Sequence, residues 1–260
     1  MALVRKEIEG DMMWLDPKDG GISNTLVKKG RREDAFMWLL RKEASGIALE
    51  CGANIGYCTI SLAKLCDRVL AFEPDKRNLK LLRKNVEGLN NCKVFESALY
   101  DINGYISFGY AQRPNLSYIT TKGEHEVPCV TIDSLNESVN FIKMDIEGGE
   151  VAAFKGAKET LENASNLKIL LEVHPQNYND QNNFEEILEW MVDIGYKFRF
   201  VISGKGKSHV VEEKYPVYKA FPKFDRKIYE NIKPEDGIPW ASRKKKNKKK
   251  VLRAIMLERK

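Results

Sequence analysis

The residues best suited to chemistry surround a short turn with a glycine at each end, Gly52-Ala-Asn-Ile-Gly56. Residues 47–50 before it are mostly apolar, and in residues 57–65 after it apolar side chains recur at helical spacing. The pattern predicts a strand, a turn and a helix, which is how α/β proteins build a ligand site at the carboxyl edge of a parallel sheet. Gly52 and Gly56 would let the backbone bend sharply and lie against that ligand.

Two acidic residues indicate which ligand this is. The pattern E-x-G-x-N-x-G, with Asn54 in the middle, lacks the third glycine of a dinucleotide site and the Lys-Ser/Thr pair of a phosphate loop. Glu50 would repel phosphate but suits a cationic ligand such as the amino group of S-adenosylmethionine. Glu73 ends the next predicted strand, where an acidic residue can hydrogen-bond a ribose diol. The alternative is a plain strand, turn and helix with surface glutamates.

The elements that position these residues follow one another as strand-helix units. Apolar runs over 47–50, 68–73, 93–99, 140–145 and 166–173 predict five strands, and helical patterns separate most of them. This order predicts an α/β fold with a doubly wound, mostly parallel sheet and a site at the strand ends. Further strands are predicted over 105–108, 127–132 and 196–202, and a helix is predicted over 146–163. The polar loop at 110–126 is expected to contact the acceptor, with a disordered excursion as the alternative. Residues 203–240 should hold a final antiparallel strand, but their pattern does not place it.

Polar residues at the ends of predicted strands four and five are the candidates for catalysis. They are Lys143, Asp145, Glu147, Glu150, Glu172 and His174. Methyl transfer from a sulfonium requires alignment of the nucleophile and removal of its proton. We predict Asp145, Glu172 and His174 as catalytic, because an imidazole with a pKa near 6.5 suits proton abstraction; alternatively, His174 caps the strand end. Asp145, Glu147 and Glu172 could gather Mg²⁺ or Mn²⁺, but we do not favour a metal.

Five segments together resemble the FkbM family of methyltransferases. They are Glu50 to Tyr57 (ECGANIGY), Ala71 to Pro74 (AFEP), Asn85-Val86, Phe141 to Gly148 (FIKMDIEG) and Leu170 to Pro175 (LLEVHP). The resemblance implies a class I, Rossmann-like methyltransferase fold, S-adenosylmethionine as cofactor and O-methylation, often of sugars. Glu50 stands where the family usually has Asp, and the region after Val201 does not align. The cofactor-binding residues we expect are Glu50, Gly52, Asn54, Gly56, Tyr57, Glu73, Ser97, Ala98 and Asp145.

The flanks of the expected methyltransferase domain, residues 44–240, differ from it in character. Residues 1–43 predict a cap with a hairpin, formed by 12–15 and 22–27, and a helix over 33–42 that covers the cofactor; simple packing of an extension is the alternative. Residues 241–260 carry ten Lys/Arg and one Glu, a charge of +9. Because the net charge of the whole chain is +6, the remaining residues carry −3. In this tail Val251, Leu252, Ile255 and Met256 would share one face of a helix.

Composition and charge restrict the partners and the compartment. The basic tail, 243–260, could contact an anionic membrane surface peripherally, or it could be a disordered solubilising segment. Because the basic residues do not spread over the body, we disfavour nucleic acid as a partner. Five cysteines without a C-x-x-C pair indicate a reducing, cytoplasmic compartment. The sequence does not specify the oligomeric state.

Three functions compete. The leading one is an S-adenosylmethionine-dependent O-methyltransferase that acts on a hydroxyl of a sugar or glycoconjugate. The second keeps the cofactor and methylates RNA or protein, with the basic tail as its sole support. The third is a non-catalytic adaptor that binds the cofactor. Cofactor binding without turnover on any acceptor would favour the adaptor.

Overall fold

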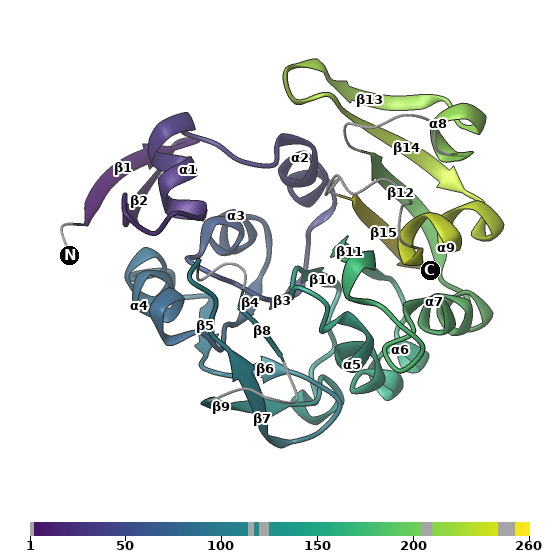
Figure 1. Cartoon of the computed structure of the whole chain (residues 1–260), viewed down its shortest axis with the longest axis horizontal. Helices are drawn as coiled ribbons and strands as arrows, with labels where there is room; N and C mark the ends of the chain where they lie inside the picture. Colours follow the sequence, from purple (N-terminus) through teal and green to yellow (C-terminus); the bar gives the residue numbers. More distant parts are fainter. Residues whose placement is uncertain (1–2, 114–116, 120–124, 204–209, 244–252) are drawn as a thin grey trace.

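A nine-stranded sheet forms the centre of the protein, and helices cover both of its faces (Figure 1). The computed structural model describes residues 3–113, 117–119, 125–203, 210–243 and 253–260. Within these residues the strands follow one another across the sheet in the order β13-β14-β12-β15-β11-β10-β3-β4-β5. Their bounds are β3 Ile47–Cys51, β4 Arg68–Phe72, β5 Cys92–Phe95, β10 Phe141–Met144, β11 Leu167–Val173, β12 Lys197–Ser203, β13 Val217–Phe221, β14 Arg226–Ile232 and β15 Arg253–Arg259.

The central strands are buried on both faces because alternate residues point to opposite sides. Leu49 and Cys51 of β3 pack into one core, and Ala48, the residue before Leu49, packs into the other. The first core includes residues of α5 (Glu150–Lys155), α6 (Lys158–Asn163), α7 (Phe184–Asp193) and α9 (Pro234–Ser242). The second includes residues of α2 (Asp34–Glu43), α3 (Tyr57–Leu65) and α4 (Lys76–Asn85). The prediction of a doubly wound α/β fold is confirmed.

The two halves of the sheet differ in strand direction. From β5 to β11 all neighbours are parallel, and the carboxyl ends of these strands carry the predicted site residues. From β11 to β13 all neighbours are antiparallel. The expectation of a mostly parallel sheet therefore holds for the half that builds the site. The antiparallel half lies where the sequence pattern was weakest.

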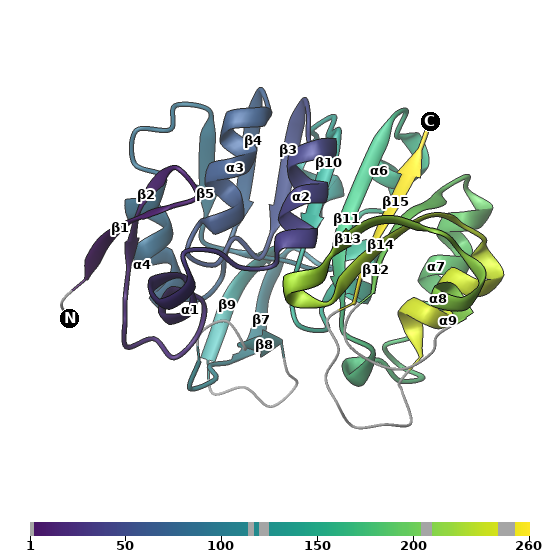
Figure 2. The ribbon, with the colours of Figure 1, turned by 90° about the horizontal axis from the view of Figure 1, so that it is seen from above.

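The final strand comes from the segment that we expected to be a tail. β15 lies between β11 and β12, antiparallel to both (Figure 2). Ile255 and Met256 have no exposed surface and pack into opposite cores, so the predicted amphipathic helix is wrong. A short apolar run suits a doubly buried strand as well as a helix, and periodicity alone cannot separate the two. The expected boundary at 240 is also wrong, because the sheet continues to Arg259.

The expected tail, residues 241–260, has two parts. Residues 253–259 are a strand inside the sheet, and Arg253 donates from Nη1 to the backbone oxygens of Trp240 at 2.6 Å and Arg243 at 3.0 Å. The lysine run and two of the four apolar residues, 251 and 252, lie outside the described residues. Contact of 243–260 with a membrane therefore stays a proposal. The apolar helix face that we expected to support it is absent, because Ile255 and Met256 are buried in the sheet. The helices of the described ranges are all too short or too polar to cross a bilayer.

The N-terminal cap is a hairpin followed by two helices. The hairpin is β1 (Val4–Ile8) with β2 (Asp11–Leu15), and residues 22–27 lie in α1 (Ile22–Lys29), so pairing of 12–15 with 22–27 is wrong. Asp19 explains the helix, because its carboxylate accepts from the amides of Gly21, Ser23 and Asn24 in the first turn. The helix expected over 33–42 is present as α2.

The cap is not a separate unit. Apolar side chains of both hairpin strands and of α1 belong to the same core as α3 and α4. Asn85 of α4 fixes the contact: it accepts from the amide of Trp14 at 2.6 Å and donates to the backbone oxygens of Trp14 and Ile55. One side chain thus joins the hairpin, the helix and the glycine turn.

A small second sheet lies beside the carboxyl end of β5. Its order is β6-β9-β7-β8, and its strands are β6 Ala98–Leu99, β7 Gly104–Gly109, β8 Tyr118–Ile119 and β9 His125–Val130. The single strand expected over 93–99 is therefore divided between two sheets. The helix expected over 146–163 is also divided, into α5 and α6. Of the loop at 110–126, which we expected to contact the acceptor, residues 114–116 and 120–124 lie outside the described residues.

Candidate active site

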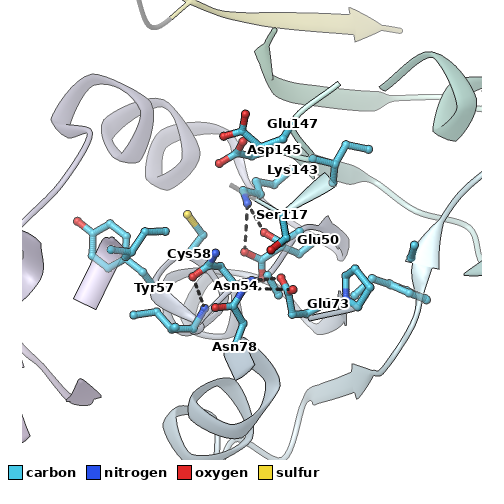
Figure 3. Close-up of a pocket in the computed structure, with 18 of the residues that line it drawn as sticks. Glu50, Asn54, Tyr57, Cys58, Glu73, Asn78, Ser117, Lys143, Asp145 and Glu147 are labelled. Atoms are coloured by element: carbon cyan, nitrogen blue, oxygen red, sulfur yellow. Dashed lines mark hydrogen bonds and ion pairs between the residues drawn. The ribbon is translucent and has the colours of Figure 1, made fainter. Parts of the chain in front are cut away.

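A pocket opens at the carboxyl ends of β3, β4 and β10, around the glycine turn (Figure 3). The turn connects β3 to α3, and the small sheet and the cap supply other parts of the wall. Most of the residues that we predicted for the cofactor come together here. Those that line the pocket are Glu50, Gly52, Asn54, Tyr57, Glu73, Ser97, Ala98 and Asp145, together with the predicted catalytic residue Glu172.

The two glycines of the turn have different roles. Gly52 has a φ of +79°, and a Cβ at this position would lie 2.2 Å from the backbone oxygen of Asp145. Gly52 therefore permits close approach of the neighbouring loop as well as of a ligand. Gly56 has a φ of +91° but does not line the pocket, and its missing Cβ makes room for Leu82 of α4. Our expectation that Gly56 touches the ligand is thus corrected: it allows α3 to pack on α4.

Glu73 connects the end of β4 to the glycine turn. Its Oε2 accepts from the amide of Asn54 at 2.8 Å, and its Oε1 accepts from the amide of Asp75 at 2.9 Å. Only 5% of its surface is exposed, and burial raises the pKa of Glu73 to about 7 although these hydrogen bonds favour the carboxylate. A carboxylate held in this way beside a pocket is in position to accept hydrogen bonds from a diol.

Glu50 is fully buried between a threonine and a lysine. Its Oε2 accepts from the hydroxyl of Thr59 at 2.6 Å, and its Oε1 lies 3.7 Å from Nζ of Lys143. Lys143 donates instead to the backbone oxygen of Gly52 at 2.7 Å. Oε1 has no hydrogen-bond partner among the described residues, and burial raises the pKa of Glu50 to about 7. An ammonium donor in the pocket would satisfy this oxygen.

Apolar side chains form another part of the pocket wall. Phe72, Leu99 and Phe108 line it, and Phe72 stacks on Phe95 with ring centroids 4.4 Å apart. Ser97 and Ala98, which we expected to bind the cofactor, directly precede Leu99 and also line the pocket. A pocket with apolar walls and a few buried carboxylates suits a flat base attached to a polar ribose.

Three carboxylates and a histidine gather beyond the glycine turn. Nε2 of His174 lies 3.7 Å from Oδ1 of Asp145, 3.7 Å from Oε2 of Glu147 and 3.8 Å from Oε1 of Glu172. Burial, followed by the charges of Asp145 and Glu33, raises the pKa of Glu172 well above its ordinary value. A carboxylate whose pKa is raised holds a proton more readily than a free one, which suits a proton acceptor.

His174 differs from our prediction in position and in protonation. It is 4% exposed and does not line the pocket, because the carboxylates lie between its ring and the cavity. Its Nδ1 lies 2.6 Å from Oε1 of Glu150. Burial opposes the charged ring, but Glu150, Glu172 and Asp145 outweigh burial and raise the pKa of His174 to about 10. A pKa near 6.5 was the reason to predict a general base, and that reason is removed.

The cap contributes residues that the sequence did not reveal. Arg32 and Glu33, between α1 and α2, line the pocket and pair with each other. Burial opposes the charge of Arg32, but Glu33, Asp145 and Glu172 together raise its pKa. Tyr57 holds this loop by accepting from the amide of Arg32 at 3.2 Å and donating to Glu9 at 2.6 Å. These residues lie in an aperiodic loop, so no spacing pattern marked them.

Further lining residues escaped prediction for a different reason. Lys143 was among the polar candidates, but we assigned it no place in the cofactor site. Cys58, Asn78 and Ser117 were not among the predicted site residues, although all three line the pocket. Asn78 of α4 donates to Glu73 at 3.3 Å, and its closeness to Glu73 in the sequence was the one available signal.

Comparison with known proteins identifies the family. The family model described as the methyltransferase FkbM domain matches residues 50–198. The 2-O-methyltransferase NoeI of Sinorhizobium fredii is 28% identical over 149 residues, which is 47% of this chain. The alignment spans 61% of that relative, less than two thirds of its length.

Solved methyltransferase structures resemble the chain at low similarity. An rRNA methylase from Streptococcus thermophilus has a TM-score of 0.44 and 11% identity, and the match covers 88% of this chain and 97% of that one. A precorrin-6y C5,15-methyltransferase from Geobacter metallireducens has a TM-score of 0.45 and 13% identity, with 95% and 94% covered. At these scores the solved structures carry no argument, and the family assignment rests on the family match. Because the match over residues 50–198 covers more than half of the chain, as the sequence motifs predicted, the chain belongs to the FkbM-domain family of methyltransferases.

Proposed function

We propose that the protein uses S-adenosylmethionine to methylate a hydroxyl group of a sugar or glycoconjugate. The observation that carries the proposal is the position of Glu172, a carboxyl group with a raised pKa, among Asp145 and Glu147 beside the cofactor pocket. A hydroxyl nucleophile has a proton to lose, and this group is placed to receive it.

The pocket residues fit the cofactor by their chemistry. Oε1 of Glu50 is a buried acceptor without a hydrogen-bond partner among the described residues, which suits the ammonium group. Glu73 suits the ribose diol, and Phe72, Leu99 and Phe108 suit the adenine. When bound, S-adenosylmethionine supplies a methyl group on a sulfonium, which leaves as a neutral thioether.

The protein's own groups then align and deprotonate the acceptor. The acceptor oxygen would take the methyl group that the cofactor supplies, and the electron pair of the broken carbon–sulfur bond would stay on sulfur. The hydroxyl proton passes to the carboxylate of Glu172. Asp145 and Glu147 accept hydrogen bonds from the acceptor and hold it in line with the methyl group. Alignment is the larger contribution, and the proton acceptor adds about 10²–10⁴-fold.

The charge around the pocket supports a neutral acceptor over RNA. Six carboxylates line it, from Glu33, Glu50, Glu73, Asp145, Glu147 and Glu172, whereas Arg32 and Lys143 are the cations among its described lining residues. Such a wall attracts a cationic cofactor and repels a polyphosphate backbone. A sugar offers several hydroxyl donors to the carboxylates. The similar protein from Sinorhizobium fredii is itself described as a 2-O-methyltransferase.

An acceptor screen with methyl-radiolabelled cofactor tests the proposal. Free sugars, lipid-linked glycans, total RNA and a denatured protein mixture are incubated with the wild-type chain and with Glu172→Gln. We expect label in a glycan, and a rate about 10²–10⁴-fold lower in the variant with cofactor affinity unchanged. The matched control is Glu189→Gln on α7, which should behave as wild type. Label in RNA or protein alone would overturn the sugar acceptor, and bound cofactor with no label anywhere would favour the adaptor.

A further inference from the structure

The ring of His174 presents a buried nitrogen to a group of carboxylates that it cannot hydrogen-bond. Its Nε2 has no hydrogen-bond partner among the described residues, and the ring is 4% exposed. The oxygens of Asp145 and Glu147 that face it lie 3.7 Å away, beyond the usual range of an N–H···O bond. A buried polar atom in this position requires an explanation, because leaving it unpaired is costly.

The orientation of the ring is fixed from its other nitrogen. Nδ1 donates to Oε1 of Glu150 at 2.6 Å, and Glu150 is itself fully buried at the start of α5. The backbone amide of His174 donates to the hydroxyl of Tyr178 at 3.0 Å. A carboxylate that accepts from one ring nitrogen directs the other toward the cluster, as in carboxylate–histidine–metal arrangements. An ion that binds Nε2 would displace the proton that this nitrogen otherwise carries.

The loop that carries Glu147 is also held in place. Glu147 has a φ of +49°, which is unfavourable for a residue with a side chain. Nδ2 of Asn177 donates to its backbone oxygen at 2.8 Å, and Nδ2 of Asn182 donates to that of Gly148 at 3.1 Å. The carboxylate therefore faces His174 from a fixed backbone and not from a free surface loop.

We infer that Asp145, Glu147 and Nε2 of His174 bind one divalent metal ion at the edge of the cofactor pocket. Their ligand atoms all lie within 4.8 Å of one another. An ion with bonds of about 2.0–2.3 Å holds its ligand atoms roughly 3–4.6 Å apart, depending on the angle between the bonds, and gaps of 3.7 Å lie within that range. One imidazole with carboxylates suits Mn²⁺, which accepts both nitrogen and oxygen ligands.

A bound ion would account for two features of the site. It pairs the buried nitrogen, and it neutralises carboxylates that share the pocket with Arg32, whose guanidinium pairs with Glu33. Oε1 of Glu172, 3.8 Å from Nε2, is near enough to act as a further ligand or to receive a proton from a bound oxygen. A hydroxyl bound to the ion would lose its proton more readily. This role rests on the proposed function, whereas ion binding does not.

The test is titration of the full chain with Mn²⁺ alone, followed by electron paramagnetic resonance. We expect one ion per chain and a ¹⁴N coupling from the imidazole. Glu147→Gln and Asp145→Asn should each weaken binding at least tenfold, and His174→Gln should remove the nitrogen coupling. The matched controls are Asp193→Asn and His125→Gln, which lie away from the cluster and should leave both readouts unchanged. Glu147→Gln is informative even if Asp145→Asn misfolds, because Glu147 lies on the loop and not beside Gly52.

Two outcomes would overturn the site. One is Mn²⁺ binding no tighter in wild type than in Glu147→Gln; the other is a nitrogen coupling that survives in His174→Gln. The same samples, assayed for cofactor binding and methyl transfer with and without a chelator, separate the two proposals. Methylation of a glycan that persists after chelation overturns the role of the ion in catalysis and leaves the proposed function. Specific Mn²⁺ binding together with label in RNA alone overturns the proposed sugar acceptor and leaves the ion site.

Discussion

The backbone amide of Asn54 donates to Oε2 of Glu73 at 2.8 Å, and this bond joins the glycine turn to the end of the neighbouring strand. Glu73 therefore does two things: it shapes the turn and it presents a carboxylate to the pocket. The sequence indicated the second role from spacing, but the first appears only when β3 and β4 are paired. Loss of Glu73 should accordingly affect the cofactor site through both.

The first prediction concerns cofactor affinity. Glu73→Ala should weaken S-adenosylmethionine binding by about 1–3 kcal/mol, because the ribose hydroxyls and the amide of Asn54 lose their acceptor. Isothermal titration calorimetry measures the change. The control is Glu87→Ala, an exposed residue after α4, which should bind as wild type. Equal affinity of Glu73→Ala and wild type would remove Glu73 from the cofactor site.

The second prediction concerns pH and stability. The pKa of Glu73 is about 7 in the folded protein and 4.5 as the reference value, so the folded state holds a proton that the unfolded chain has lost between these values. Stability contributed at Glu73 therefore falls as pH rises from about 4.5 to 7 and is level above that. Glu73→Gln lacks this titration. The difference in unfolding free energy, wild type minus variant, should decrease by about 2–3 kcal/mol from pH 5 to pH 8.

Urea denaturation at a series of pH values measures this difference. Glu50 also has a pKa raised to about 7, but it is present in both proteins and cancels in the comparison. A difference that stays constant across the pH range, or that grows with pH, would contradict the raised pKa of Glu73.

The third prediction uses two glycines with nearly equal backbone angles. Gly52 has a φ of +79° and Gly88 a φ of +87°, but a Cβ at Gly52 would lie 2.2 Å from Asp145 O, whereas a Cβ at Gly88 meets nothing within 4 Å. Gly88→Ala should cost about 1–2 kcal/mol, the strain of the left-handed region. Gly52→Ala should cost clearly more and abolish cofactor binding. Thermal unfolding and calorimetry together measure both effects, and equal losses in the two variants would show that strain alone matters.

The sequence predicted the parallel half of the fold because its signals are local. Most of the five strands β3, β4, β5, β10 and β11 are short buried runs that end in a turn or a polar residue, and the site residues found from the pattern lie at or near such ends. Glu50, Glu73 and Asp145 were found in this way, since parallel strands bring their carboxyl ends together. Knowledge of which residues end the strands was enough to place them in one pocket.

The rest depends on contacts that no local pattern reports. Arg32 reaches the pocket because Asn85 and Tyr57 fix the cap against the glycine turn, across long sequence separations. His174 follows a strand, as expected, but its pKa depends on Glu150, which approaches only through the packing of α5. The direction of a side chain and the charges around it are thus set by tertiary structure.

The C-terminal strand was missed for a related reason, and it gives the fourth prediction. Ile255 has no exposed surface and lies in the middle of the sheet, between β11 and β12. Ile255→Ala should therefore destabilise the protein by about 2–5 kcal/mol, the usual cost of a cavity in a core. Val217→Ala on β13, where 45% of the valine is exposed, is the control and should change stability by less than about 0.5 kcal/mol. Urea denaturation compares them. If residues 253–259 were a tail outside the sheet, both substitutions would have the same small effect, and a chain that ends at Ser242 would unfold like the full chain.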